Sequence, residues 1–397
     1  MENKQKSNNK KNMTFVFLYA IGSILVVAGH CGNGGIDLAF DFFPIYAFHL
    51  GLFMFCSGYF YKTKNEENWA KYTWGKFKKL VIPMLIWNVV YGIFVQLTKL
   101  KGFTVGEDIT IYNLTIAPFI DGHQFLYNMC FWYIPSLFLI QTITCGLRKI
   151  LNRVVNINEY IFFIIYFMLG VLGIYLSNKG YNKGAYLLLV RTLYFFPFFG
   201  LGILYNKKIE KIDKLNNLIY FSIVIIMQLI IIFVKGKAPD FKPSVCNDFS
   251  KNLILPFAIG YLGIAFWLRV AKILEPVTRN SKVVNIIADN AYSIMAHQFF
   301  GFFIVKCIYA IASKFIPIFS DFDMAKFKSF IWYYYNPKGI NTFYIIYLVA
   351  GVVIPIMIGS ILKKIKELII EKYKTKKDNM SIIETIKEPN KKIKIKV

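Results

Sequence analysis

Charged residues are scarce in this sequence: they make up only 17% of its 397 positions. Soluble domains have about a quarter of their residues charged and slightly less than half apolar. Here 56% of the residues are hydrophobic and 18% are aromatic, which is more apolar surface than one water-soluble core can bury. The composition therefore excludes a soluble enzyme, a secreted disulfide scaffold and a disordered chain, and it indicates an integral membrane protein.

Acidic residues are the scarcer charged class, with 22 Asp and Glu against 47 Lys and Arg and a formal net charge of +25. Such an excess alone would suggest nucleic-acid binding. The basic residues, however, cluster in the connections between apolar segments and at both termini, and they form no stripe with interleaved aromatics. We therefore expect no nucleic-acid partner.

Paired cysteines are absent as well. The sequence has no CxxC motif and no Cys/His spacing typical of a metal site, so the cysteines are interpreted as small buried apolar residues and no bound metal is predicted. The six are Cys31, Cys56, Cys130, Cys145, Cys246 and Cys307.

Long apolar segments are what the sequence has instead. At about 20 residues per crossing, ten of them alternate with short polar connections, which predicts an all-helical polytopic membrane protein. A basic head (1–12) precedes a membrane domain (13–362), and a basic, mobile tail (363–397) follows it. Because the first segment has spanning length and no convincing cleavage site, we expect no cleaved signal peptide. The predicted spans are 13–31, 38–61, 80–98, 126–146, 160–177, 184–205, 216–235, 253–274, 289–313 and 341–362.

The basic residues predict the orientation of these spans. Taken together, the head, the tail and every second connection between them carry 33 Lys and Arg, against 12 in the alternate connections. Lys and Arg concentrate in cytoplasmic connections, so we expect both termini in the cytoplasm and the protein in the cell membrane. The basic connections are 62–79, 147–159, 206–215 and 269–288; the alternate ones are 32–37, 99–125, 178–183, 235–252 and 314–340.

Histidines are the first candidates for chemistry, because their ordinary pKa lets them exchange a proton near neutral pH. The sequence has four, His30, His49, His123 and His297, and three of them fall within apolar segments. A single intramembrane His is more often a packing residue than a catalyst, but three in one bundle favour a site. His30 ends the first span before a glycine-rich connection, and His49 is predicted about 13 Å below the outer face.

Other polar groups in or beside the spans have two interpretations each. Arg191 needs an anion, carbonyls or water inside the bundle, and the alternatives are a structural partner, Asp37 or Asp41, or a substrate anion. Lys78 and Lys79 are either topology anchors or a phosphate-binding patch. The small residues Ser57 and Gly58 either let a neighbouring helix pack closely or leave room for an acyl chain.

Six short stretches stand out along the sequence. Each alone is a weak pattern, but their order and their placement on the spans, taken together, form a more specific one. They are Ser23–His30, Phe48–Phe60, Lys78–Pro83, Phe131–Leu137, Arg191–Gly202 and Asn290–His297. Together they resemble the acyltransferase-3 family of multispanning membrane O-acyltransferases. The resemblance is strongest to its branch of fucose-O-acetylase-like sugar and polysaccharide acetyltransferases.

The resemblance implies transfer of an acyl group, usually acetyl from acetyl-CoA, to a hydroxyl of a cell-envelope glycan or lipid-linked sugar. Acyl-CoA is then a co-substrate, and no permanently bound cofactor is expected. The family's essential His corresponds to His30. The basic residue that often stands eleven positions earlier is Tyr19 here, so Arg191, Lys78 and Lys79 become candidates for binding the donor's anionic groups. Further candidates for substrate contact are His49, Ser57, Tyr59 and His297.

The reaction itself requires a general base and hydrogen-bond donors that stabilise an oxyanion. His30 would accept the proton of the sugar hydroxyl during attack on the thioester and pass it to the leaving thiolate. His49, Ser57 or Tyr59 could stabilise the oxyanion. No serine lies in a nucleophile-elbow pattern, which favours direct transfer. Because acetyl-CoA is cytosolic and His30 is predicted near the outer face, either the donor enters a deep cavity or the first span is tilted or broken.

Two other functions fit the composition. A transporter or flippase for a lipid-linked or anionic solute would also need buried charges such as Arg191 and Lys306, but the sequence lacks two halves with matching interrupted segments. A glycan polymerase or a scaffold would need a functional outer connection, and 314–340 is the one candidate. The aromatic residues of that connection either belong to the membrane-interface belt or stack on sugar rings.

Overall fold

The computed structural model describes residues 11–32, 35–36, 38, 42–122, 124–155, 157–244, 246, 249 and 251–387, with side chains up to residue 372. Every regular element in this part of the chain is a helix, as predicted. The possible partners Asp37 and Asp41 and the candidate His123 lie outside the described residues.

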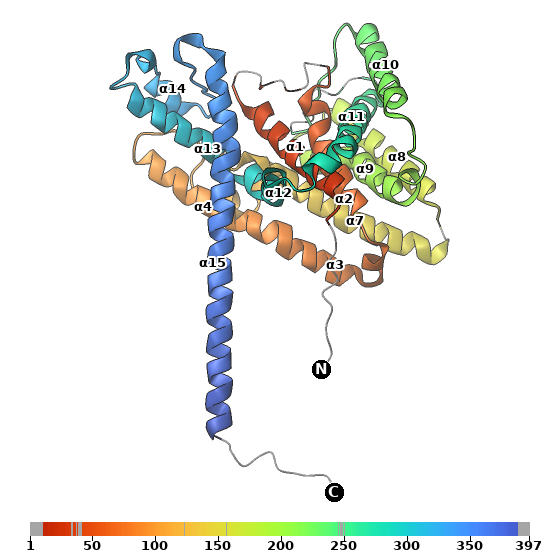
Figure 1. Cartoon of the computed structure of the whole chain (residues 1–397), viewed down its shortest axis with the longest axis horizontal. Coiled ribbons are helices and arrows are strands. Elements are labelled where there is room, and N and C mark those ends of the chain that lie inside the picture. Colours follow the sequence, from red (N-terminus) through yellow and green to blue (C-terminus); the bar gives the residue numbers. More distant parts are fainter. Residues whose placement is uncertain are drawn as a thin grey trace.

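Fifteen α-helices make up the described architecture (Figure 1). They are α1 (Met13–His30), α2 (Ile45–Tyr59), α3 (Trp69–Lys76), α4 (Ile82–Lys99), α5 (Ile111–Thr115), α6 (Ala117–Ile120), α7 (Tyr133–Val154), α8 (Glu159–Asn178), α9 (Ala185–Leu204), α10 (Asn217–Lys235), α11 (Leu255–Thr278), α12 (Lys282–Asp289), α13 (Ala291–Ala312), α14 (Met324–Ser329) and α15 (Tyr344–Lys387). Short 3-10 segments are Thr63–Asn68, Met129–Trp132, Pro317–Phe319, Pro337–Gly339 and Asn341–Phe343, and π turns are Phe77–Val81 and Tyr205–Ile209.

Ten apolar helical segments correspond one to one with the ten predicted spans. Within the described residues, nine of them are long and apolar enough to cross a membrane. The tenth, α2, has only 15 residues, or about 22 Å at 1.5 Å per residue, which is less than the roughly 30 Å of a hydrocarbon core. The multispanning helical architecture is therefore confirmed, whereas the side on which the termini lie stays a prediction.

The start of α2 differs from its prediction. The helix begins at Ile45, directly after Pro44, and not at residue 38. Proline has no backbone N–H and restricts the residue before it to extended conformations, so a helix readily begins after it. His49 therefore lies about one turn inside α2, closer to the helix start than the longer span predicted.

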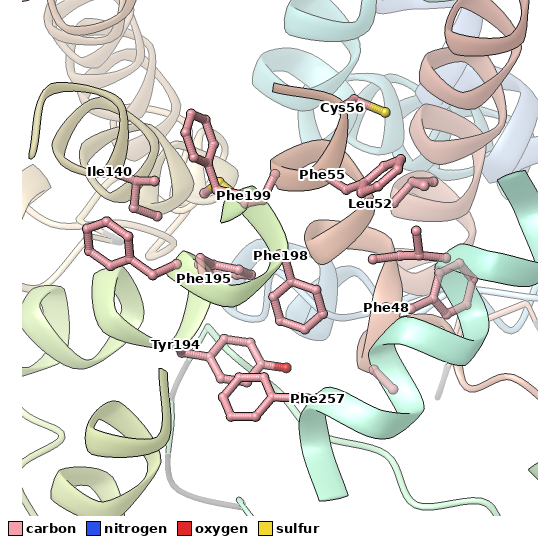
Figure 2. Close-up of a cluster of buried hydrophobic side chains, with 14 of the residues drawn as sticks. Phe48, Leu52, Phe55, Cys56, Ile140, Tyr194, Phe195, Phe198, Phe199 and Phe257 are labelled. Atoms are coloured by element: carbon pink, nitrogen blue, oxygen red, sulfur yellow. The ribbon is translucent and has the colours of Figure 1, made fainter. Parts of the chain in front are cut away.

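The helices α2 and α9 form the centre of the bundle and touch through their backbones. A Cβ atom added at Gly58 would lie 2.0 Å from the carbonyl oxygen of Phe199, and one added at Gly202 would lie 2.0 Å from that of Phe55. Only glycine permits such an approach. Figure 2 shows the aromatic side chains of α9 between α2 and α7, with Phe257 of α11 beside them. Gly58 thus serves helix packing.

The outer helices α10 and α15 bury little of their apolar surface, as expected of helices in contact with lipid. α15 has 44 residues, about 66 Å at 1.5 Å per residue, and projects far beyond the bundle (Figure 1). The tail predicted to begin at residue 363 starts inside this helix, because its Lys, Glu and Ile residues are compatible with continued helix. Its mobility stays a prediction.

A buried ion-pair cluster fixes the connection between α9 and α10 to α11. Asp213 pairs with Arg269, and its other oxygen lies 2.7 Å from the Nζ of Lys272. Burial raises the pKa of the Asp213 carboxyl, but hydrogen bonds from Lys272 and Tyr205 and the charges of Lys272 and Arg269 outweigh it, so the pKa lies below its ordinary value. Asp213 is therefore ionised at neutral pH.

Candidate active site

A cavity of about 370 Å³ runs along α1 and α2. Its lining on α2 extends from Tyr46 to Ser57, which is about 16 Å at 1.5 Å per residue, and Phe60 and Tyr61 continue it just beyond the helix. At one end, the His30 end, it is lined by His30 and Ser244; at the other, the Lys76 end, by Tyr72 and Lys76. The cavity therefore follows α2 over about three turns. Since α1 is a continuous helix from Met13 to His30, no break in the first span is involved.

His30 is the last residue of α1, where the chain turns extended at Cys31. Its Nδ1 lies 3.0 Å from the Oε1 of Gln298 on α13. The amide nitrogen of Gln298 points the other way, to the Sγ of Cys130 at 3.2 Å and the carbonyl of Met295 at 3.4 Å. Because Oε1 can only accept, the network assigns the ring proton to Nδ1 and a free lone pair to Nε2. This is the tautomer that a general base needs.

Aromatic rings surround the His30 side chain. The ring centroids of Phe299, Trp332 and Tyr46 lie 5.2, 6.1 and 6.2 Å from that of His30. The Tyr46 hydroxyl donates to the carbonyl of Gly29, which fixes Tyr46 beside the end of α1. His30 is therefore held in orientation by Gln298 and by packing against Phe299 and Tyr46.

His49 and Ser57 line the same cavity as His30. His49 is almost fully buried, and its Nδ1 lies 2.6 Å from the carbonyl of Ile45; Nδ1 therefore donates, and the neutral ring can only accept through Nε2. Ser57 hydrogen-bonds Tyr19. Ser57 lies eleven residues along α2 from Tyr46, about 16 Å, so it belongs to the Lys76 half of the cavity and not to the His30 end.

Comparison with known protein families identifies the family of this chain. The acyltransferase domain of the acyltransferase-3 family matches residues 18–360. The chain belongs to the acyltransferase-3 family. No curated protein and no solved structure gives a significant match. The protein is therefore a multi-pass membrane acyltransferase, which brings together an acyl donor and an acceptor within a bilayer; the match does not resolve the branch of the family.

Three of the residues predicted to contact substrate lie outside the cavity of this acyltransferase. Tyr59 directs its hydroxyl to Glu210, 2.9 Å away. Nδ1 of His297 lies 2.8 Å from the Tyr91 hydroxyl. Arg191 is buried, with its Nε 2.9 Å from the carbonyl of Ser244.

The position of Arg191 is nevertheless close to the cavity wall. Its guanidinium lies 4.7 Å from the ring of Trp132, and both Trp132 and Ser244 line the cavity. Arg191 therefore supports the wall from behind through a backbone carbonyl and an aromatic ring, which are two of the partners that a buried guanidinium can use.

The lysine in the cavity is Lys76 and not Lys78 or Lys79. Lys78 and Lys79 lie on the π turn between α3 and α4 and are exposed. Lys76, at the end of α3, lies over the ring of Tyr72 at 5.2 Å and lines the cavity. A π turn holds one more residue than an α turn, which changes the face that neighbouring side chains share.

The structure brings to the candidate site two residues that the sequence patterns did not single out, Gln298 beside His30 and Lys76 in the cavity lining. Gln298 follows directly after the predicted His297, and Lys76 precedes the predicted Lys78 by two residues. Their only sequence signal was a polar residue in or beside an apolar segment. No group of three or more His, Cys, Asp or Glu side chains that could hold a metal occurs among the described residues.

Proposed function

We propose that this acyltransferase transfers an acyl group, in the first instance acetyl, from acyl-CoA to a hydroxyl of a cell-envelope glycan or its lipid-linked precursor. We place it in the polysaccharide-acetylating branch of its family and in the cell membrane, with His30 as the general base. One observation carries the proposal: a single cavity joins a histidine of basic tautomer at one end to a lysine at the other.

The cavity suits the shape and charge of an acyl-CoA. The phosphates of the donor would bind at the Lys76 end, since a lysine acts as a point charge for phosphate. The narrow pantetheine arm would extend past Tyr19 and Ser57. The thioester would then lie near His30. This arrangement lets a donor from the cytosolic side reach a base at the predicted outer end.

The transfer itself needs one base and one path for a proton. The acceptor hydroxyl attacks the thioester carbonyl as its proton moves to Nε2 of His30, and a carbon–oxygen bond forms. The carbon–sulfur bond then breaks, and the imidazolium returns the proton to the thiolate, so that an ester and free CoA result. Gln298 stabilises the imidazolium by accepting from Nδ1. A positioned base of this kind contributes about 10²–10⁴-fold to the rate.

Acyl transfer from radiolabelled acetyl-CoA into envelope glycan tests the proposal. Membranes containing wild type, His30→Ala or His297→Ala at matched levels of folded protein are compared. We expect His30→Ala to lose at least about 100-fold of the transfer rate. His297→Ala, which removes a buried histidine that does not line the cavity, is the control and should retain most of the rate.

Two outcomes would contradict this function. Unchanged transfer by His30→Ala would exclude His30 as the base. Wild-type protein that neither labels glycan nor hydrolyses or exchanges acetyl-CoA would exclude the donor, and the transporter or flippase hypothesis would then take its place.

A further inference from the structure

The connection 314–340 folds over the His30 end of the cavity and places one exposed aromatic ring there. Trp332 is 38% exposed. Its ring centroid lies 6.1 Å from that of His30 and 5.3 Å from that of Phe299, which it meets edge to face. A large apolar side chain thus remains accessible directly beside the proposed base.

Buried anchors on both sides hold the backbone around Trp332. The carbonyl of Ile331 accepts from Nζ of Lys306 at 2.6 Å, and Lys306 is almost completely buried on α13. On the other side, the Tyr347 hydroxyl of α15 lies 3.2 Å from both the backbone N and the carbonyl of Tyr335. The loop therefore keeps its course without depending on the indole, and the ring is pre-organised.

Lys306 has no catalytic task in this arrangement. Its ammonium group lies 4.9 Å from the ring of Tyr334 and donates to the backbone next to Trp332. A buried lysine is costly in a membrane protein and needs partners such as these. Its position links α13, which carries Gln298 and Phe299, to the loop that carries Trp332.

Trp332 is not among the residues that line the donor cavity. The donor and the indole therefore meet His30 from different sides. A hydroxyl that gives its proton to His30 must come within about 3 Å of Nε2. The rest of the acceptor molecule must then contact the protein surface near the His30 ring. The exposed surface beside the His30 ring includes the indole of Trp332.

We propose that Trp332 forms the acceptor subsite of this enzyme by stacking against a sugar ring. The C–H groups on one face of a pyranose carry partial positive charge and suit the electron-rich face of an indole. The inference rests on the proposed function and identifies its acceptor as a cyclic sugar. A tryptophan of the interface belt would lie at the lipid-facing periphery, whereas this ring contacts His30 and Phe299.

Kinetics with two acceptors tests the subsite. De-O-acylated envelope glycan is the sugar acceptor, and water, read as acetyl-CoA hydrolysis without glycan, is an acceptor that cannot stack. We expect Trp332→Ala to raise the KM for glycan about tenfold, the upper end of what an aromatic contact contributes, with kcat and hydrolysis close to wild type. Trp332→Phe should recover part of the loss. Phe330→Ala, at a 54% exposed aromatic of the same loop, is the matched control and should behave as wild type.

Several results would overturn the subsite. An unchanged KM in Trp332→Ala would do so directly. An equal loss of hydrolysis would show that Trp332 only supports His30, and an equal effect of Phe330→Ala would show that only the loop fold matters. Wild type that hydrolyses acetyl-CoA but never acylates glycan would overturn the subsite and leave the donor half of the proposed function standing. Absence of both reactions in wild type would overturn the proposed function itself, and the subsite with it.

Discussion

Gln298 indicates which nitrogen of His30 carries the proton and which is left for the proposed role as a base. Its Oε1 accepts from Nδ1, and its amide nitrogen is directed to Cys130 and Met295. In the serine-hydrolase triads an aspartate fills the equivalent place and also stabilises the imidazolium. A neutral amide supplies the orientation without the charge, which is the less costly choice because Gln298 is fully buried within the bundle.

Replacing Gln298 tests this role. Gln298→Leu removes the acceptor, so the ring can turn or change tautomer, and we expect kcat to fall about 10–100-fold, as is typical when a group that orients a functional histidine is lost. Gln298→Glu keeps an acceptor at the same place and should recover most of the rate. The measurement is kcat and KM for label transfer at matched protein levels. A wild-type rate in the Leu variant would contradict this orienting role. If both variants were equally inactive, Gln298 would serve only to pack the helices.

At the level of single residues, the sequence predicted some members of the candidate site and missed their neighbours. His30, His49 and Ser57 were predicted and line one cavity. His297 and Lys78 were also predicted, but Gln298 and Lys76 are the residues that contact His30 or the cavity. Successive residues on a helix are rotated by about 100°, and a sequence without known partners does not reveal which face of an all-apolar helix looks inward.

Among the helices, the contact between α2 and α9 fixes the position of one cavity wall, because α2 lines the cavity and packs against α9. Gly58 and Gly202 bring the two backbones together, and α2 supplies one cavity wall from Tyr46 to Ser57. Because no side chain separates these helices, the position of α2 is set by main-chain packing. Any enlargement at either glycine must move α2 or α9.

Alanine substitutions test that contact. Gly202→Ala would place a Cβ atom 2.0 Å from the Phe55 carbonyl, and we expect the free energy of unfolding to fall by about 1–3 kcal/mol, the usual effect of overpacking. Gly75→Ala on α3 is the control: no atom lies within 4 Å of its added Cβ, and alanine favours a helix over glycine by about 1 kcal/mol. Thermal unfolding in detergent measures both. Equal stability of Gly202→Ala and wild type would contradict the close contact.

The sequence predicted the number of apolar helical segments better than their lengths. Hydropathy identified all ten apolar segments, because burial in lipid requires them. It overestimated the length of α2, because a hydropathy average does not distinguish helical from non-helical apolar residues before Pro44. It also placed the end of the last span at residue 362, although α15 continues to Lys387, because polar helix residues outside a bilayer carry no hydropathy signal.

For the molecule as a whole, the cavity offers an answer to how a cytosolic donor and an outer acceptor can share one base. The charge bias predicts that the Lys76 end faces the cytosol and the His30 end the outside. The exposed Trp332 lies at the same end as His30. Under this account the acyl group crosses the bilayer while still attached to CoA, and only the ester appears on the outer side.

Transfer between two compartments tests this account most directly. Sealed proteoliposomes enclose de-O-acylated envelope glycan, radiolabelled acetyl-CoA is added outside, and protease access to the tail selects the preparation with both termini outward. The account predicts label in the enclosed glycan with wild type and none with His30→Ala. Label that appears only when glycan and acetyl-CoA are on the same side of the membrane would contradict it.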